Sequence, residues 1–206
     1  MTWFQAIDYA GVLVFAITGA LVAARLKHDI VTFVFFATLT GIGGGTLRDL
    51  LIGAPVFWIS DQGYLAVCIV ASLLVWILGE PRWHGMLLKW LDAIGLSGYA
   101  MLGAAKALEH GSRPLVAIAM GVISATFGGV LRDLFGGQPS VFLRREIYVT
   151  AALASAAAFV IARMFGAPGI PAGIAAFLVG FALRGGAILY GWSLPGHNRA
   201  PDKEKI

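Results

Sequence analysis

The sequence predicts an all-α integral membrane protein with seven transmembrane helices, arranged as two inverted three-helix repeats plus a seventh helix. The 206 residues are 59% hydrophobic and 13% charged, and the charged share is about half that of a soluble domain. Apolar stretches recur along the chain, and the sequence aligns with itself without gaps at an offset of 84 residues. A soluble fold of this size could not cover so much apolar surface with polar groups. A soluble enzyme, a disordered regulator and a disulfide scaffold are therefore excluded.

Each predicted span is an apolar segment near the length of about 20 residues that crosses the hydrocarbon core of a bilayer. The first is closed by basic residues that begin at Arg25, the second and fifth contain glycine clusters, and the third is closed by Glu80. The fourth is the most polar and carries Lys89, Asp92 and Lys106, the sixth is rich in alanine, and the seventh stands outside the repeats. In order, the spans cover residues 7–24, 30–51, 63–79, 87–107, 114–135, 147–162 and 168–190.

The distribution of Lys and Arg between the connections predicts the orientation, because cytoplasmic loops carry an excess of these residues. With the N-terminus outside, nine fall on the cytoplasmic side and three on the other. We therefore expect one transmembrane domain at residues 1–192, with its N-terminus outside, and a cytoplasmic tail at residues 193–206. The nine are Arg25, Lys27, Arg82, Lys89, Arg144, Arg145, Arg199, Lys203 and Lys205, and the three are Lys106, Arg113 and Arg163.

The offset of 84 residues defines two repeats, at residues 7–79 and 91–163. The matched positions are glycines and charged residues, which chance similarity between apolar segments would not align. Because each repeat holds three spans, the second copy enters the bilayer from the opposite side, as in transporters whose site lies at the repeat interface. The matched pairs include Asp8 and Asp92, Gly44 and Gly128, Gly45 and Gly129, Arg48 and Arg132, and Asp49 and Asp133.

Glycine clusters fall at equivalent places in the second and fifth spans. Glycine costs about 1 kcal/mol in a helix interior relative to alanine, so Gly43, Gly44 and Gly45, and likewise Gly128 and Gly129, predict breaks or kinks in these helices. Unpaired backbone groups at that depth are tolerated only inside protein or along a wet cavity. We expect backbone carbonyls beside the breaks, and nearby hydroxyls, to coordinate a cation. The candidate ligands are Thr40, Gly41, Ser124 and Ala125.

An arginine and an aspartate follow each glycine cluster, as Arg48–Asp49 and Arg132–Asp133. Ionisable residues within membrane segments are costly and usually face a bundle interior or a water-filled cavity. We favour a role in a transport path or its gate, in which each aspartate neutralises the neighbouring arginine. The alternative is that each arginine extends to the lipid headgroups.

Three further charges support these motifs. Asp8 and Asp92 lie near the starts of the first and fourth spans, where the helix dipole alone favours a carboxylate. The sharper hypothesis pairs Asp8 with one motif arginine and Asp92 with the other, and an Asp8–Arg132 pair is the version that mutation would test. Lys106 is expected to extend to the headgroups, and the alternative is that it lines a pore or senses voltage.

The sequence shows no pattern typical of metal binding, enzymatic catalysis or nucleic-acid binding. His, Cys and carboxylate residues show neither metal-ligand spacing nor a nucleophile–base set, so we expect no metal, no cofactor and no enzymatic activity. The basic residues are scattered singly and form no stripe for nucleic acid.

The doubled motif, GGGTLRD at residues 43–49 and GGVLRD at residues 128–133, resembles the prokaryotic branch of the trimeric intracellular cation channels. That branch also takes in small bacterial membrane proteins regarded as glycine transporters. The resemblance implies a homotrimer in a bacterial inner membrane. It also implies a potassium-preferring pore in each subunit, lined largely by the first, second, fourth and fifth spans, with the two motifs on kinked helices.

The favoured interpretation is therefore a potassium-permeable monovalent cation channel. The rival is a secondary transporter of glycine or a similar small zwitterion, in which an arginine would hold the carboxylate and an aspartate the amine. Both use the same motifs, so the sequence leaves the choice open. The expected partners are potassium or other monovalent cations, the lipid bilayer and further copies of the chain, with no nucleic acid.

Overall fold

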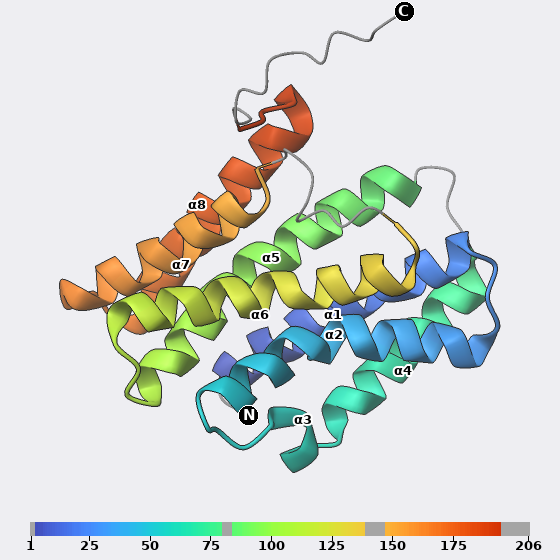
Figure 1. Cartoon of the computed structure of the whole chain (residues 1–206), viewed down its shortest axis with the longest axis horizontal. Helices are drawn as coiled ribbons and strands as arrows, with labels where there is room; N and C mark the ends of the chain where they lie inside the picture. Colours follow the sequence, from blue (N-terminus) through green and yellow to red (C-terminus); the bar gives the residue numbers. More distant parts are fainter. Residues whose placement is uncertain (1–2, 80–83, 139–146, 195–206) are drawn as a thin grey trace, which may run out of the picture.

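The described part of the chain forms eight helices, and every predicted span lies on one of them (Figure 1). The structure, a computed structural model, describes residues 3–79, 84–138 and 147–194. Helix ends fall within four residues of the predicted span ends. One short helix, α3, is not among the predicted elements. The helices are α1 (Trp3–Arg25), α2 (Ile30–Leu51), α3 (Phe57–Ser60), α4 (Gly63–Leu78), α5 (His84–Glu109), α6 (Pro114–Phe135), α7 (Val149–Met164) and α8 (Gly169–Tyr190).

By length and composition, four helices are able to cross a membrane: α1, α2, α6 and α8. The helices α4 and α7 are apolar but have 16 residues each, which is about 24 Å at the helical rise. The longest helix, α5, has 26 residues but carries the charges noted above. The chain is thus an all-helical membrane protein. Part of the predicted tail, residues 195–206, lies outside the described residues. So do six of the nine basic residues that predict the orientation of the chain in the membrane: Arg82, Arg144, Arg145, Arg199, Lys203 and Lys205.

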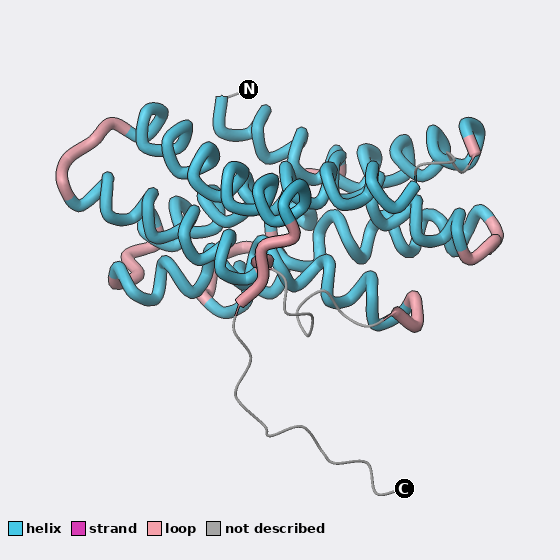
Figure 2. Tube along the Cα trace, turned by 90° about the horizontal axis from the view of Figure 1, so that it is seen from above, coloured by secondary structure: helices cyan, strands magenta, loops and turns pink. Residues whose placement is uncertain are grey.

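The helices α2 and α6 pack against each other in opposite directions, and each has its own neighbours (Figures 1 and 2). The helix α2 contacts α1 and α4, while α6 contacts α5 and α7. The two three-helix units therefore have the same internal packing. The last helix, α8, packs on α5 and α7 and has no counterpart beside α1 and α4.

Polar and apolar side chains are distributed in the reverse of the soluble pattern. Asp49 and Arg132 are fully buried, whereas Val31, Leu78 and Leu115 are 75–81% exposed. In a bilayer, apolar side chains face lipid and costly ionisable groups turn to the bundle interior. The burial pattern therefore agrees with a membrane-embedded fold.

The predicted breaks in α2 and α6 are wrong. Both helices are continuous over 22 residues, straight through their glycine clusters. The carbonyls of Gly41 and Ala125 consequently lie within uninterrupted helix, and the expectation that a break frees them to bind a cation is wrong as well. Helix propensity is a weak prior that tertiary packing overrides, and here the packing partner of each glycine cluster is the other helix.

Glycine lets α2 and α6 approach closely where they cross. A methyl group at Gly44 would overlap the backbone carbonyl oxygen of Ser124, and one at Gly128 would overlap that of Thr40. Small residues of this kind allow close backbone contact between membrane helices. The two contacts are reciprocal, because each residue of the first is 84 positions from its counterpart in the second.

Candidate functional site

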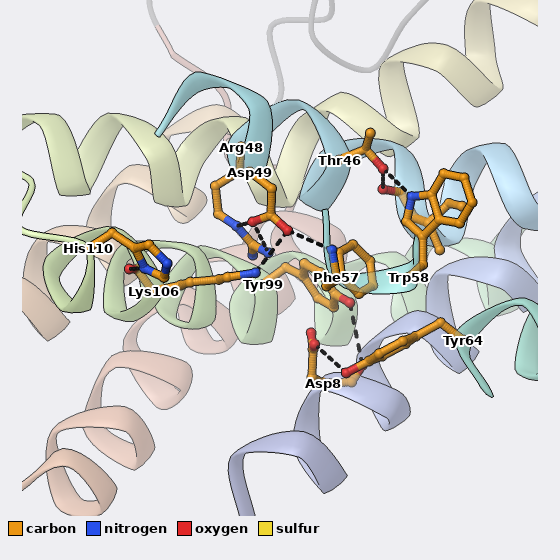
Figure 3. Close-up of polar contacts among 11 residues, drawn as sticks. Asp8, Thr46, Arg48, Asp49, Phe57, Trp58, Tyr64, Tyr99, Lys106 and His110 are labelled. Atoms are coloured by element: carbon orange, nitrogen blue, oxygen red, sulfur yellow. Dashed lines mark hydrogen bonds and ion pairs between the residues drawn. The ribbon is translucent and has the colours of Figure 1, made fainter. Parts of the chain in front are cut away.

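Three charged side chains meet near the C-terminal end of α2, and we call Arg48, Asp49 and Lys106 the α2 cluster (Figure 3). The Nε of Arg48 donates to Oδ1 of Asp49 at 2.8 Å, and Nζ of Lys106 donates to Oδ2 at 2.8 Å. The backbone N–H of Phe57 also donates to Oδ2, at 3.1 Å. Asp49 is fully buried and Arg48 is 2% exposed. Arg48 and Asp49 therefore neutralise each other, as buried ionic groups require, and Lys106 leaves the cluster with one net positive charge.

The short helix α3 covers the α2 cluster. The ring centroid of Phe57 lies 5.9 Å from Cζ of Arg48 and 5.7 Å from Nζ of Lys106, both within the range of cation–π attraction. The indole Nε1 of Trp58 donates to Oγ1 of Thr46 at 2.9 Å, which connects α3 to α2. An aromatic ring thus closes the side of the cluster that faces the α2–α4 connection.

A second set of charges meets near the C-terminal end of α6, and we call Asp92, Arg132 and Asp133 the α6 cluster. From Arg132, Nε donates to Oδ1 of Asp133 at 3.0 Å and Nη1 donates to Oδ1 of Asp92 at 2.9 Å. The same Nη1 donates to Oγ1 of Thr18 at 3.1 Å. Arg132 therefore joins α1, α5 and α6, and it is fully buried.

The two clusters lie at opposite ends of the α2–α6 pair, because the helices are antiparallel and each cluster follows its own glycines (Figure 1). Thr40 and Ser124 lie between them, at the helix crossing. The hydroxyl of Thr40 donates to the carbonyl of Phe36 at 2.7 Å. The hydroxyl of Ser124 is buried and has no hydrogen-bond partner among the described residues. The oxygens of both predicted hydroxyl ligands therefore keep free lone pairs, because Thr40 uses its hydroxyl only as a donor.

The remaining glycines of the motifs provide room for neighbouring side chains. A methyl group at Gly43 would lie 3.0 Å from Cδ1 of Leu131. One at Gly45 would lie 2.7 Å from Cε1 of Phe57. A methyl group at Gly129 would lie nearest the hydroxyl of Tyr148. All five motif glycines are thus packing positions in this structure.

The burial of the motif arginines decides against their extension to the headgroups. Arg48 and Arg132 are 2% and 0% exposed, and both contact carboxylates of the interior. Lys106 was expected to extend to the headgroups, and that expectation is wrong: its side chain is 18% exposed and its ammonium binds Asp49. The buried carboxylate holds it, because the cost of a lone charge there exceeds that of bending one side chain inward.

The expected pairing of Asp8 with Arg132 is also wrong, and Asp92 does not pair with Arg48. Arg132 binds Asp92 of its own repeat. Asp8 instead accepts a hydrogen bond from the hydroxyl of Tyr64, at 2.8 Å to Oδ2. The reason is geometric: α1 begins at the end of the bundle where α2 terminates, which is the end opposite the α6 cluster.

The structure adds Arg184 and Tyr148 to the candidate residues. Arg184 on α8 is 2% exposed and lies with its Cζ 5.2 Å from the ring centroid of Tyr148. Tyr148 is buried beside the α6 cluster, and a methyl group at Gly129 would lie 2.9 Å from its hydroxyl. An arginine within an apolar span is a signal that could have identified Arg184 from the sequence.

Two grooves on the described surface are apolar. One of about 460 Å³ lies between α1, α5 and α8, and another of about 430 Å³ lies beside the α2–α6 crossing. No charged residue lines either groove. The charged side chains of the two clusters therefore lie outside these two grooves.

A model of the Glycine transporter family matches the chain twice, at residues 5–80 and 89–164. The chain belongs to this family. The two matches are offset by 84 residues, the spacing of the repeat seen in the sequence. Family membership confirms the resemblance drawn from the doubled motif, and it confirms that the chain is a membrane channel or transporter rather than an enzyme.

Bacterial relatives cover most of the chain. The UPF0126 membrane protein of Vibrio cholerae is 38% identical over 92% of this chain and 80% of its own length. The UPF0126 inner membrane protein YadS of Escherichia coli is 38% identical over 71% of this chain and 72% of its own length. A solved structure of the TRIC trimeric intracellular cation channel orthologue from Rhodobacter sphaeroides superimposes with a TM-score of 0.90. It is 46% identical and covers 93% of this chain and 100% of that chain.

Proposed function

We propose that the protein is a monovalent cation channel permeable to potassium, with a pore in each subunit. The observation that carries the proposal is the burial of both arginine–aspartate motifs, as two ion-paired clusters at opposite ends of one helix pair. Charges inside a membrane bundle are costly and typically mark ion or substrate pathways. The likeness to the Rhodobacter sphaeroides channel, at 46% identity, supports the same class.

The proposed path runs along the α2–α6 crossing from one cluster to the other, lined by α1, α2, α5 and α6. Protein oxygens replace the hydration shell of an ion in a selective pore, and the hydroxyl oxygens of Ser124 and Thr40 are the candidates for that role. A cation passing a fixed arginine needs a compensating carboxylate. Asp49 supplies it at Arg48, while Asp92 and Asp133 supply it at Arg132.

We also propose that all seven long helices cross the membrane, as two repeats related by an in-plane two-fold axis. In a two-fold arrangement, each contact recurs between the equivalent residues. The reciprocal glycine contacts of α2 and α6 support this, as do Phe15 and Tyr99, which are 84 residues apart and meet edge to face at 5.4 Å. With seven crossings, the two termini lie on opposite sides of the membrane. The excess of Lys and Arg in cytoplasmic loops puts the N-terminus outside and the C-terminus in the cytoplasm. Protease digestion of a C-terminal tag, in intact spheroplasts and in inverted vesicles, tests this orientation.

The proposed setting is a homotrimer in a bacterial inner membrane. The name of the Escherichia coli relative includes the inner membrane, and that of the Rhodobacter sphaeroides structure includes a trimeric channel. Light scattering of the purified protein, with the detergent contribution subtracted, measures the subunit number.

A second candidate function is transport of glycine or a similar small zwitterion. It is favoured by the description of the family whose model matches the chain. In this alternative, Arg132 would hold the carboxylate of the solute, and Asp92 or Asp133 would hold its ammonium group. Both candidates place the same residues on the path, so a functional measurement separates them.

Reconstitution in a planar bilayer with a potassium gradient tests the proposal. We expect unitary currents that reverse near the potassium equilibrium potential and that fall severalfold in Asp133→Asn. Asp29→Asn is the matched control, because Asp29 caps the exposed start of α2 and asparagine caps a helix equally well. Electrical silence of a folded wild-type protein, together with saturable glycine uptake into vesicles, would replace the channel by the carrier.

A further inference from the structure

The two charge clusters contain equivalent residues in different arrangements. The equivalent residues, each pair 84 positions apart, are Asp8 and Asp92, Arg48 and Arg132, and Tyr64 and Tyr148. In the second repeat, Arg132 donates to Asp92 at 2.9 Å. In the first repeat, Tyr64 donates to Asp8 at 2.8 Å instead, and within the described chain Asp8 forms no ion pair with Arg48. One constellation thus adopts two arrangements within a single molecule.

The ring of Phe57 accounts for the difference. It occupies the place beside Gly45 that Tyr148 takes beside Gly129 in the second repeat. On its other side, the ring packs edge to face against Tyr64, with the centroids 4.7 Å apart. The ring therefore lies between Tyr64 and the α2 cluster, and it keeps the aspartate bound by Tyr64 away from the cluster arginine (Figure 3).

The contacts that hold Phe57 are few and reversible. Its helix has four residues, so moving it breaks no long helix. Its ring contacts the two cations of the α2 cluster and its N–H contacts Asp49. Two cation–π contacts together amount to about a tenfold factor in an equilibrium constant. A population shift of that size is well within reach of a ligand or a voltage.

We propose that Phe57 blocks the ion path at the α2 cluster, and that Asp8 exchanges from Tyr64 to Arg48 when the ring withdraws. The inference rests on the proposed function, which supplies the path. In the blocked arrangement, two cationic side chains of the cluster share the single carboxylate of Asp49. Arrival of Asp8 balances the second cation and gives Arg48 the second carboxylate that Arg132 already has in Asp92. A cation then meets a neutral entrance, without the ring.

Single-channel recordings test the block and the exchange separately. We expect Phe57→Ala to raise the open probability about tenfold, and Phe57→Leu to raise it less because leucine keeps most of the volume. Tyr64→Phe releases Asp8 and raises the open probability as well, whereas Asp8→Asn cancels the gain when added to Phe57→Ala. The control is Ile59→Val, on the same helix but with an exposed side chain, which leaves the open probability unchanged.

A thiol measurement gives a readout that does not require conduction. The native Cys68, which is buried, is replaced by alanine, and Thr40→Cys places one thiol between the two clusters. We expect a membrane-impermeant thiol reagent to modify it about ten times faster in Phe57→Ala than in wild type. Ile59→Val again serves as the control and leaves the rate unchanged. An unchanged rate in Phe57→Ala overturns the block.

The two sets of results separate the inference from the proposed function. A silent wild type whose thiol becomes accessible in Phe57→Ala overturns the channel but supports Phe57 as a barrier. A conducting wild type with no response to Phe57→Ala in either measurement overturns the barrier and leaves the channel intact. An undiminished gain in the Phe57→Ala, Asp8→Asn double variant overturns the exchange. If Phe57→Ala does not elute as a folded oligomer, Phe57→Leu decides by the same criteria.

Discussion

Gly44 on α2 lies directly against the backbone carbonyl of Ser124 on α6, and a methyl group at Gly44 would overlap that oxygen. The equivalent residue in the other repeat, Gly128, lies against Thr40 in the same way. The close approach of α2 and α6 therefore requires glycine, whose side chain is a single hydrogen atom, at both positions. Backbone atoms cannot move aside as a flexible side chain can, so the helices themselves must separate to admit a larger residue.

We expect Gly44→Ala and Gly128→Ala each to destabilise the fold by about 1–3 kcal/mol, the usual cost of overpacking. Unfolding in mixed micelles with increasing SDS measures the change. Gly98→Ala is the matched control, because Gly98 on α5 has open space where a methyl group would lie, and alanine favours helix. A loss of stability in Gly98→Ala equal to that in Gly44→Ala would show that the helix crossing is not the cause.

Removing Arg132 takes the ion-pair partner from buried Asp92 and one partner from buried Asp133. We expect Arg132→Met to cost about 3–5 kcal/mol, the range for breaking a buried ion pair. Adding Asp92→Asn should recover part of the loss, with a coupling of about 1–3 kcal/mol between the two sites. Asp8→Asn shares no partner with Arg132 and should combine with Arg132→Met additively. The same SDS titration measures the three single and two double variants, and an additive result for Arg132 and Asp92 would contradict the observed pair.

The spans and their ends were predictable because the signals are local. Hydrophobic length and a closing charge are properties of consecutive residues, and the bounds of α2 and α6 match the predicted spans at both ends. The repeat was predictable because it is carried by glycines and charges. The burial of Arg48 and Arg132 also followed from the cost of charge in a membrane.

The partners of these residues were not predictable in the same way. Whether Gly44 breaks a helix or packs it depends on Ser124, which is 80 residues away. Whether Asp8 binds an arginine or Tyr64 depends on how α1, α3 and α4 meet. The role of Phe57 had no sequence signal, because a single aromatic residue in a short connection has no periodic context. Family resemblance supplied the class of transport, which composition and spacing could not.

Asp61, which lies outside the membrane-spanning segments, makes a pH-dependent contribution to the stability of the folded state. The hydroxyl of Tyr9 donates to it at 2.6 Å and the N–H of Gly63 at 3.0 Å, and these hydrogen bonds hold the pKa of Asp61 below its ordinary value of 3.8. Because the folded-state pKa is the lower one, the stabilisation is complete above the unfolded-state pKa and is lost as pH falls through the folded-state value.

Tyr9→Phe removes the hydroxyl while keeping the ring that stacks on Tyr64 at 4.1 Å. We expect it to lower the melting temperature in detergent at neutral pH, and the difference from wild type to shrink at about pH 3, where carboxylates protonate. Tyr190→Phe, on an exposed tyrosine, should have no such pH dependence. An equal deficit for Tyr9→Phe at both pH values would show that Asp61 is not the group responsible.

Lys106 sets the sign of the charge at the α2 cluster, where it and Arg48 share Asp49. Lys106→Met should leave the Arg48–Asp49 pair neutral and raise the potassium conductance by about twofold at ~0.1 M salt, because a fixed positive charge repels the permeant cation. The gain should shrink toward ~1 M salt, where the screening length falls to about 3 Å. Lys89→Met is the control: Lys89 lies on the same helix but is exposed, so its removal should leave the conductance unchanged. Single-channel conductance against salt concentration measures both variants. A gain in Lys106→Met that persists undiminished at high salt would point to a change in pore shape rather than in charge.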